Sequence, residues 1–494
     1  MSAPEQTRLA ATDLDIVVIG AGISGINAAY RLKTQLPEAT FKVLECRDEI
    51  GGTWDLFRFP GVRSDTPIFA LGFEWAPWPS SHQPFADGAS ILSYLKDCVS
   101  RFRIDEHILL QHRLLEANWT SQTNRWNLLV HDENESRRRA YTAKFLTFAT
   151  GYYDYQDPLS SHIRGLESFE GEIIHPQFWP AKCDYAGKNV TIIGSGATAV
   201  TLLPALQKEA ATVTMLQRSP SYVLSTSNRP FRIPWLISKA LPLSVIYTWI
   251  RWYHILVGYC FFLFSRYLPL YSSRLLRNAA RRQLPSWVPE DLHFKPEYSP
   301  WDQRLCIAPD GDFYRALHQP NVQIRTAIIE RVSARAIHIH GKMIPTDVIV
   351  PATGLRMRFG GRVNIKLDGV PILDTLPNRL LWHGAMLSGV PNAMFMLSYG
   401  VGPWTLAVDN AAHILVRLFK FLRSRQIGYL APELPADTVM PKLDIRPFSS
   451  TYVKEAAGTH PKYGGDGPWR PKNNPVVDYF HARWGDLTRG LHYE

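Results

Sequence analysis

The strongest constraint on the fold of this chain is a pair of glycine clusters, each placed between a strand-like and a helical segment. The first cluster, Gly-Ala-Gly-Ile-Ser-Gly at 20–25, comes after the apolar run Asp15–Gly20 and opens a helical pattern from Ile23 to Lys33. The second, Gly-Ser-Gly-Ala-Thr-Ala at 194–199, stands between the runs NVTIIG and ATAVTLLPAL. Strand, glycine turn and helix at this spacing are typical of dinucleotide-binding βαβ units. The sequence therefore predicts an α/β fold with two Rossmann-like domains.

Each position of the first cluster has a mechanical reason. Gly20 permits the tight turn, Gly22 lets a pyrophosphate approach the backbone, and Gly25 lets helix and strand pack together. The positive end of the adjoining helix attracts the phosphate charge. Glu45 ends the next strand-like run, Phe41–Glu45, and is expected to accept hydrogen bonds from a ribose diol.

The second cluster differs from the first at the end of its second strand, TVTMLQ. This strand ends in Arg218 and Ser219 instead of an acid. An acid would repel a 2′-phosphate, whereas Arg218 can hold one through charge-assisted hydrogen bonds. The alternative is an arginine that is merely exposed at a strand end. A carboxylate at the first site and an arginine at the second together predict tightly held FAD and exchanging NADPH.

The cysteines bear on which electron acceptor the reduced flavin uses. The chain has 494 residues, enough for two or three domains, and its 5 cysteines never form a C-x-x-C pair. We therefore expect no disulfide scaffold, no metal site and a reducing, intracellular (cytoplasmic) location. Disulfide reductases share the two-site architecture but need a cysteine pair beside the flavin, which leaves O₂ as the remaining common acceptor.

The net charge and the apolar segments indicate which partners the protein can have: nucleic acid, a membrane or a small substrate. The formal charge of +10 is spread along the chain and accompanies no nucleic-acid-binding motif, so we expect no nucleic acid. The apolar run Ile255–Phe264 is shorter than the roughly 20 residues that span a bilayer, and we interpret it as a buried helix or the wall of a substrate pocket. The basic amphipathic segment Ser273–Leu284 is interpreted as a solvated helix face, with contact to a membrane surface as the alternative. The aromatic stretch Trp235–Tyr271 favours a small but bulky, apolar organic substrate.

The stretch FEGEIIHPQFWP resembles a known fingerprint. It matches, without a gap, the pattern F-x-G-x-x-x-H-x-x-x-W-P of type I Baeyer–Villiger monooxygenases, and the specified positions are Phe169, Gly171, His175, Trp179 and Pro180. A linker histidine and a core aromatic residue are the structural alternatives for two of these positions. The resemblance implies that this stretch links the two domains and that its histidine couples cofactor movement to catalysis.

Further matches extend along nearly the whole chain. The run GGTWDLFRFPGVRSD at 51–65 is similar to the flavin-covering segment of that family, and the ATG triplets at 149–151 and 352–354 are similar to its domain-crossing strands. The runs GSGATAV, LQRSP and PWDQRLC resemble the subfamily of ethionamide-activating monooxygenases. Two departures stand out: Gln303 replaces a lysine that many relatives carry, and Leu355-Arg356 replaces an aromatic residue and an acid.

The resemblance implies a reaction and two catalytic residues, Arg304 and Asp65. Reduced flavin and O₂ form a C4a-peroxide, whose anion attacks a ketone carbonyl to give an ester or lactone. Arg304 would stabilise that anion by charge, and Asp65 would hold the guanidinium in place. One alternative is a flavin monooxygenase acting mainly on sulfur or nitrogen, which needs no such anion. A non-catalytic membrane or scaffold protein is a further alternative, which the intact glycines disfavour.

The resemblance also implies cofactor contacts and a domain order. Contacts to FAD are Gly20, Gly22, Ser24, Gly25, Glu45, Thr53, Trp54, Asp55, Leu56, Asp65 and Leu114. Contacts to NADP are Arg63, Ser64, Gly194, Ser195, Gly196, Ala197, Thr198, Ala199, Val200, Arg218 and Ser219.

We expect a discontinuous FAD domain with the NADP domain inserted into it. The expected segments are an FAD part at 1–155, a linker at 156–187, the NADP domain at 188–350 with an aromatic insertion at 228–300, a second FAD part at 351–431, and a surface-wrapping tail at 432–494.

Overall fold

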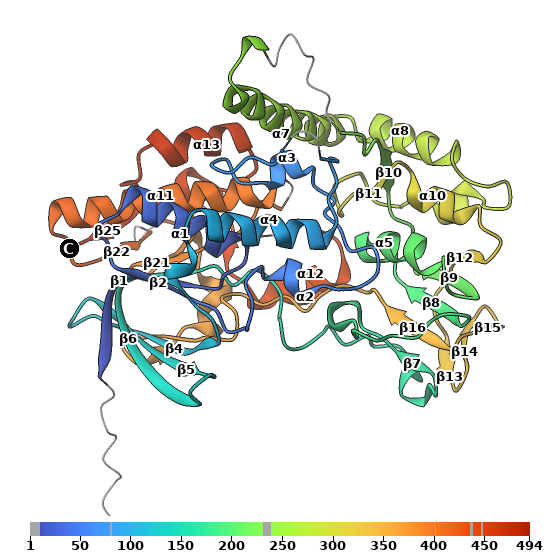
Figure 1. The fold of residues 1–494 in the computed structure, drawn as a ribbon, viewed down its shortest axis with the longest axis horizontal. Helices are drawn as coiled ribbons and strands as arrows, with labels where there is room; N and C mark the ends of the chain where they lie inside the picture. Colours follow the sequence, from blue (N-terminus) through green and yellow to red (C-terminus); the bar gives the residue numbers. More distant parts are fainter. Residues whose placement is uncertain (1–9, 80–81, 231–238, 401, 435–437, 446–447) are drawn as a thin grey trace, which may run out of the picture.

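The computed structural model describes residues 10–494 except 80–81, 231–238, 401, 435–437 and 446–447. Two α/β lobes lie side by side, and a pair of helices crosses the top of the molecule above them (Figure 1). Part of the predicted aromatic insertion, including Trp235, lies outside the described residues.

The first lobe is built on the larger sheet. Its parallel part joins β3, β2, β1, β6 and β21. Beyond β6, strands β5 and β4 follow in antiparallel pairs, β17 joins β4 in parallel, and β18 pairs antiparallel with β17. The strands are β1 (Ala11–Ile19), β2 (Phe41–Leu44), β3 (Ile108–Leu109), β4 (His112–Thr120), β5 (Arg125–Asp132), β6 (Arg137–Phe148), β17 (Asn364–Leu367), β18 (Val370–Pro371) and β21 (Ala393–Phe395). Strands from both ends of the chain thus share one sheet.

The helices of the first lobe also come from both ends of the chain. They are α1 (Ile23–Gln35), α2 (Thr53–Leu56), α3 (Ile68–Leu71), α4 (Gly88–Arg101), α11 (Trp404–Arg425) and α13 (Pro475–Trp484). In α1, Arg31 donates to Asp409 of α11 at 2.9 Å, and both side chains are buried. The predicted discontinuous domain is confirmed by this sharing of sheet and core.

The second lobe is a parallel sheet in the order β12-β9-β8-β16-β7. Its three central strands, β9, β8 and β16, are almost entirely buried, as is usual for a parallel sheet covered on both faces. The elements are β7 (Glu172–Ile173), β8 (Asn189–Ile193), α5 (Ala197–Leu206), β9 (Thr212–Gln217), α10 (Asp312–Leu317), β12 (Val322–Thr326) and β16 (Val348–Pro351). This lobe lies between the two parts of the first in sequence, as the inserted domain was predicted to do.

Smaller elements complete the fold. Beside the second lobe lie β10 (Val223–Thr226), α9 (Glu290–His293), β11 (Cys306–Pro309), β13 (Arg331–Ser333), β14 (Ala336–Ile339) and β15 (Lys342–Pro345). Toward the C-terminus lie β19 (Leu381–Trp382), β20 (Met386–Leu387), β22 (Leu430–Pro432), β23 (Leu443–Asp444), α12 (Thr451–Ala456), β24 (Lys462–Tyr463) and β25 (Leu491–Tyr493).

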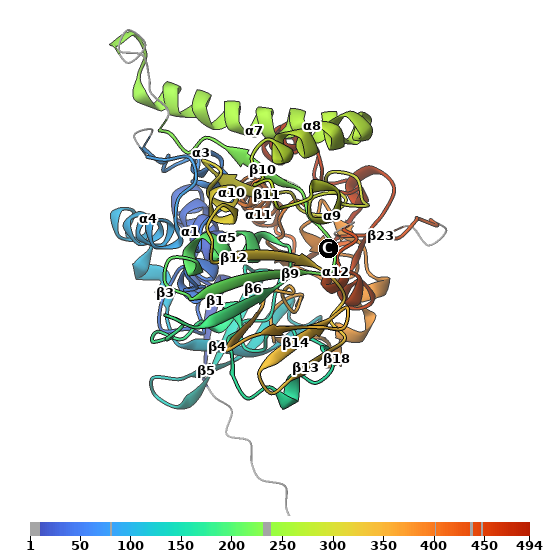
Figure 2. The same cartoon turned by 90° about the vertical axis from the view of Figure 1, so that its right-hand side faces the viewer.

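The aromatic insertion forms two consecutive helices, α7 (Leu243–Tyr267) and α8 (Pro269–Arg281). The interpretation of 255–264 as a buried helix is wrong, and the other interpretation, the wall of a substrate pocket, stays a prediction. Ile255 is the one fully buried apolar residue of that run, and Leu256 and Val257 are exposed. The reason is that α7 packs against the first lobe along one side only (Figure 2). In the described part of the chain no single helix is long and apolar enough to cross a membrane, although α7 and α8 together, bent by 116°, meet that criterion of length and composition.

Candidate active site

The first glycine turn is sterically closed except where a pyrophosphate would approach. Gly20 has a φ of +101°, and a Cβ atom there would lie 2.8 Å from the carbonyl oxygen of Ala149. A Cβ atom on Gly25 would lie 1.8 Å from the carbonyl oxygen of Gly20. At Gly22, by contrast, the nearest atom would be the Cα of Gly52 at 3.5 Å. The turn therefore leaves space at the position where a dinucleotide needs it.

Glu45 lies directly beside this turn. Its side chain is buried, and Oε2 accepts a hydrogen bond from the Ala21 amide at 2.7 Å. Oε1 accepts another from the Arg47 amide at 3.0 Å. The carboxylate is thus held rigidly at the end of β2, in the position from which the sequence predicts contact with a ribose.

The second glycine turn repeats the first. Gly194 has a φ of +141°, and a Cβ atom there would lie 2.3 Å from the carbonyl oxygen of Ala352. A Cβ atom on Gly196 would meet nothing within 4 Å. Gly196 caps α5 without any side-chain hydrogen bond, so the helix N-terminus remains available for phosphate oxygens. In both lobes the first glycine of the turn packs against the alanine of an ATG triplet.

The C-terminal tail covers the edge of the second turn, which sequence reasoning missed. Arg218 is exposed and donates from Nη2 to Thr451 Oγ1 at 2.9 Å. Gln303 donates to Ser449 Oγ at 3.1 Å. Tyr452 lies against Gly354, where a Cβ atom would come within 2.8 Å of its ring. The tail was expected only to wrap the surface, and no local pattern in it indicated this contact.

Arg304 lies where the two lobes and the tail meet. Loss of hydration would lower the pKa of its guanidinium, but Tyr152, Asp65 and Tyr452 outweigh that effect and raise the pKa. Among the described residues, however, no salt bridge joins Arg304 to Asp65 within 4 Å. The direct ion pair expected from the resemblance is therefore not formed, although the two charges are close enough to interact.

Cys306 connects this arginine to the second glycine turn. It begins β11, is buried, and donates from Sγ to the Ser195 carbonyl oxygen at 3.8 Å. Burial and the nearby Asp65 raise the pKa of its thiol to about 12, against the opposing effect of Arg304. The thiol stays protonated at neutral pH and serves as a packing group.

Several predicted cofactor contacts have side chains that already have protein partners. Asp55 is buried between Arg47 and Arg58, the latter at 3.0 Å. Arg63 pairs with Asp312 of α10, which links the two lobes. Ser24 accepts a hydrogen bond from Trp404 Nε1 at 2.8 Å, Ser64 bonds to the backbone of Thr66, and Thr53 bonds to Tyr153 at 2.7 Å.

The remaining predicted contacts lie in the core or around the two turns. Trp54 packs beside the main core, Leu114 is buried in β4, and Ala199 and Val200 are buried in α5. Leu56, Ala197 and Thr198 lie around the two turns, and Ser219 comes directly after Arg218 at the end of β9, exposed. Their contacts to cofactor remain predictions.

The linker fingerprint is tightly packed around its glycine. A Cβ atom on Gly171 would lie 2.3 Å from the Asp347 carbonyl oxygen and 2.5 Å from the Phe169 ring. His175 accepts a hydrogen bond from the Gln177 amide at 3.2 Å, and burial lowers the pKa of its imidazole. Its Nε2 atom is buried and has no hydrogen-bond partner among the described residues. Trp179 contacts Tyr185 edge-on, and Pro180 is exposed.

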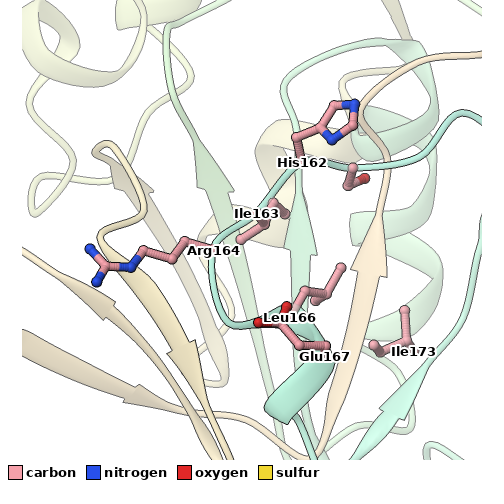
Figure 3. Close-up of a pocket in the computed structure, with 7 residues that line it drawn as sticks. His162, Ile163, Arg164, Leu166, Glu167 and Ile173 are labelled. Atoms are coloured by element: carbon pink, nitrogen blue, oxygen red, sulfur yellow. The ribbon is translucent and has the colours of Figure 1, made fainter.

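A surface hollow of about 660 Å³ also lies on the linker. Its lining includes His162 and Arg164, whose side chains point away from each other (Figure 3). Glu167 and Ile173 line the same hollow. Since the chemically active groups do not converge, this hollow is not the reaction site.

One cluster in the described structure has the composition of a metal site. Ligand atoms of Glu74, Asp409 and His413 lie within 4.8 Å of one another. Arg31 and Arg483 bond to both carboxylates, at 2.7 to 3.0 Å. Two cations already balance these acids, so the cluster is an ion-pair network that joins α1, α11 and α13.

Comparison with known proteins places this geometry in a family. Residues 14–241 match the model of flavin-binding monooxygenase-like proteins. The FAD-containing monooxygenase EthA of Mycobacterium tuberculosis is 38% identical over 483 residues, covering 97% of this chain and 97% of that protein. The chain belongs to the flavin-binding monooxygenase-like family. A probable FAD-binding monooxygenase, AlmA of Acinetobacter baylyi, is 38% identical over 97% of this chain and 96% of its own length.

Solved structures agree on the fold. An ε-caprolactone-bound cyclohexanone monooxygenase matches with a TM-score of 0.76 at 21% identity, covering 98% of this chain and 100% of that one. OTEMO in complex with FAD and NADP matches with a TM-score of 0.74 at 19% identity, covering 97% and 99%. The chain is an FAD-dependent monooxygenase, and OTEMO, which shares its fold, was solved with both FAD and NADP bound. The predicted cofactors and fold class are confirmed.

Proposed function

We propose that this enzyme inserts one atom of O₂ beside the carbonyl of a small apolar ketone, giving an ester or lactone. The observation that carries the proposal is the placement of Arg304 among Asp65, Tyr152 and Tyr452, beside the second glycine turn. FAD, once reduced by NADPH, supplies the activation of O₂. The two glycine turns, uncrowded at Gly22 and open at Gly196, would hold the two cofactors.

Arg304 acts by charge in this proposal. Baeyer–Villiger attack produces negative charge on oxygen, and a guanidinium that is always protonated stabilises such charge without moving a proton. The raised pKa of Arg304 keeps that charge at every working pH. Asp65 is the proposed positioning acid, acting over a distance longer than a direct ion pair.

An aromatic contact lies close to Arg304 in the sequence. Trp301 lies three residues before it and contacts Phe262 of α7, with ring centroids 6.0 Å apart. One structural relative, the cyclohexanone monooxygenase, was solved with a lactone bound. Both observations support a carbonyl substrate with an apolar body.

The alternative is oxygen transfer mainly to sulfur or nitrogen. A soft nucleophile needs no stabilised anion, so such a reaction would not depend on Arg304. Gln303 supports this alternative, because it replaces the lysine that many relatives carry and donates a hydrogen bond to Ser449.

The two functions separate in one experiment. Arg304→Ala and Arg304→Lys are compared with the wild type for NADPH-dependent oxidation of a ketone and of a sulfide, with product mass and hydrogen peroxide measured together. We expect the ketone rate of Arg304→Ala to fall by about 100-fold or more, as on loss of one oxyanion donor, while sulfide oxidation persists. Arg335→Ala, an exposed arginine near the linker, is the control. Equal loss or equal retention of both reactions in Arg304→Ala contradicts the proposal.

A further inference from the structure

The helices α7 and α8 form an arm that lies across the top of the molecule, with one face that no other described helix or strand covers (Figures 1 and 2). The exposed apolar residues on this arm are Leu243, Val245, Trp249, Tyr253, Leu256, Val257, Tyr267, Leu268, Leu270, Tyr271 and Leu275. Trp249 is 74% exposed and Leu270 is 72% exposed. Val245, Trp249, Tyr253 and Leu256 recur at spacings of three and four, so they lie together on one side of α7. Apolar surface gathered in this way marks an interaction site and not ordinary solvated surface.

Packing fixes which side of α7 faces outward. Ile246, Ile250 and Ile255 are buried against the first lobe. Arg251 is buried on the same side and donates to backbone carbonyls of α3 and of Gly72. Rotating α7 to bury Trp249 would break these hydrogen bonds. The buried guanidinium of Arg251 would then have lost these partners, which is strongly unfavourable. The apolar face is therefore a stable property of the fold.

Charge accompanies the apolar face. From Leu243 to Arg281 neither helix contains an aspartate or glutamate. Arg274 and Arg282 are exposed and form no salt bridge with any described residue. They share a helical face with Tyr271 and Leu275, because residues three or four apart lie on the same side of a helix. The surface is thus apolar and aromatic with unpaired positive charge at its side.

We propose that this arm docks on an anionic lipid bilayer, lying in the interface without crossing it. Aromatic residues, leucine and arginine on one helical face are the composition of interfacial helices. Crossing is excluded by the inner face, which Ile246, Ile250, Leu276 and other buried residues attach to the protein. The proposal goes beyond the proposed reaction and does not depend on it.

A second copy of the chain is the main alternative occupant. A two-fold contact places the same patch on both partners. Because the arm has no acid of its own, such a contact would bring Arg274 and Arg282 toward a surface with no opposing negative charge. A bilayer containing anionic lipid supplies that charge at any position along the arm.

The first test is flotation of the FAD-bound enzyme with lipid vesicles. We expect binding to vesicles of phosphatidylcholine mixed with phosphatidylglycerol, weaker binding to phosphatidylcholine alone, and release by salt. Absence of binding to the anionic vesicles overturns the proposal. So does a concentration-dependent dimer, seen by sedimentation velocity without lipid, that Trp249→Ser abolishes.

Matched variants distinguish vesicle binding by this face from non-specific binding through exposed residues elsewhere on the protein. Leu270→Ser is paired with Ile328→Ser, since Ile328 is 71% exposed but lies outside the arm. We expect about tenfold weaker vesicle binding for Leu270→Ser alone, from the lost apolar burial. Arg274→Gln with Arg282→Gln should weaken binding roughly 25-fold, at about fivefold per arginine, whereas Arg335→Gln with Arg489→Gln should not.

Each variant is checked for bound FAD and for its thermal unfolding temperature, which surface changes leave near the wild-type value. Equal vesicle binding by the arm variants and their controls overturns the proposal. Because vesicle binding is read without turnover, its outcome is independent of whether the enzyme oxidises ketones.

Discussion

Arg218 is the residue on which coenzyme choice depends in our interpretation. It stands exposed at the end of β9, and in this structure Thr451 of the tail accepts one of its hydrogen bonds. We expect Arg218→Ala to raise the KM for NADPH by about 10- to 100-fold, because a lost charge-assisted bond costs roughly 1.5–3 kcal/mol. The KM for NADH should change little. Steady-state kinetics with both coenzymes measure this, and a parallel rise in both KM values would refute the assignment.

His413 makes the stability of the first lobe depend on pH. Burial lowers the pKa of its imidazole from 6.5 to about 4, with Arg31 and Arg483 acting in the same direction and Asp409 against it. The unfolded chain therefore binds more protons between these values, and the free energy of unfolding falls as pH drops below 6.5. The loss attributable to this group is about 2 kcal/mol at pH 5.

Denaturant unfolding of the wild type and of His413→Gln, at neutral pH and at mildly acidic pH, measures this contribution. The variant should lose less stability than the wild type on acidification. An identical pH dependence in the two proteins would show that His413 does not titrate as the structure indicates.

At the scale of the element, the two glycine turns have the same construction but different tolerances. Gly25 has no room for a methyl group, whereas Gly196 faces open space. We expect Gly25→Ala to yield little FAD-bound protein, since helix and strand must separate. Gly196→Val should fold and keep its FAD but raise the KM for NADPH by about tenfold or more, through lost phosphate contacts.

Flavin absorbance and coenzyme kinetics distinguish these outcomes. Gly258→Val is the control for Gly196→Val, because Gly258 of α7 likewise has nothing within 4 Å of a built Cβ atom. Normal flavin content in Gly25→Ala, or normal NADPH kinetics in Gly196→Val, would contradict the roles given to the turns.

At the scale of the whole molecule, the proposed reaction site is assembled from distant parts of the chain. Arg304 comes directly after the loop that contacts α7 through Trp301, and Arg266 of α7 bonds to Asp302 at 3.2 Å. Arg63 of the first lobe pairs with Asp312 of the second. The arm thus contacts the segment that precedes Arg304, and an ion pair joins the two lobes.

Local segments could be predicted because their causes are local. The strand, turn and helix around Gly194 agree with the sequence pattern to the residue in α5 and β9. The fingerprint at Gly171 likewise corresponds to a real steric requirement, the approach of the Asp347 carbonyl. Glycine positions and the spacing of apolar residues therefore predict such short-range geometry.

The expectations that failed depended on partners far along the chain. The outward face of α7 could not be known, since whether Ile255–Phe264 is covered depends on which other segments reach it. The contact of Thr451 with Arg218 spans 233 residues, and no pattern in the tail indicates it. Arg304 and Asp65 are neighbours without the expected direct pair, an outcome that packing decides.

The sequence by itself determined two dinucleotide-binding units, their cofactors and their order in the chain, because glycine turns and strand–helix periodicity are local properties. Only the tertiary structure decided which face of α7 is bare and which residues surround Arg304. Burial and ion pairing are set by the sum of long-range contacts, and those exist only once the chain has folded.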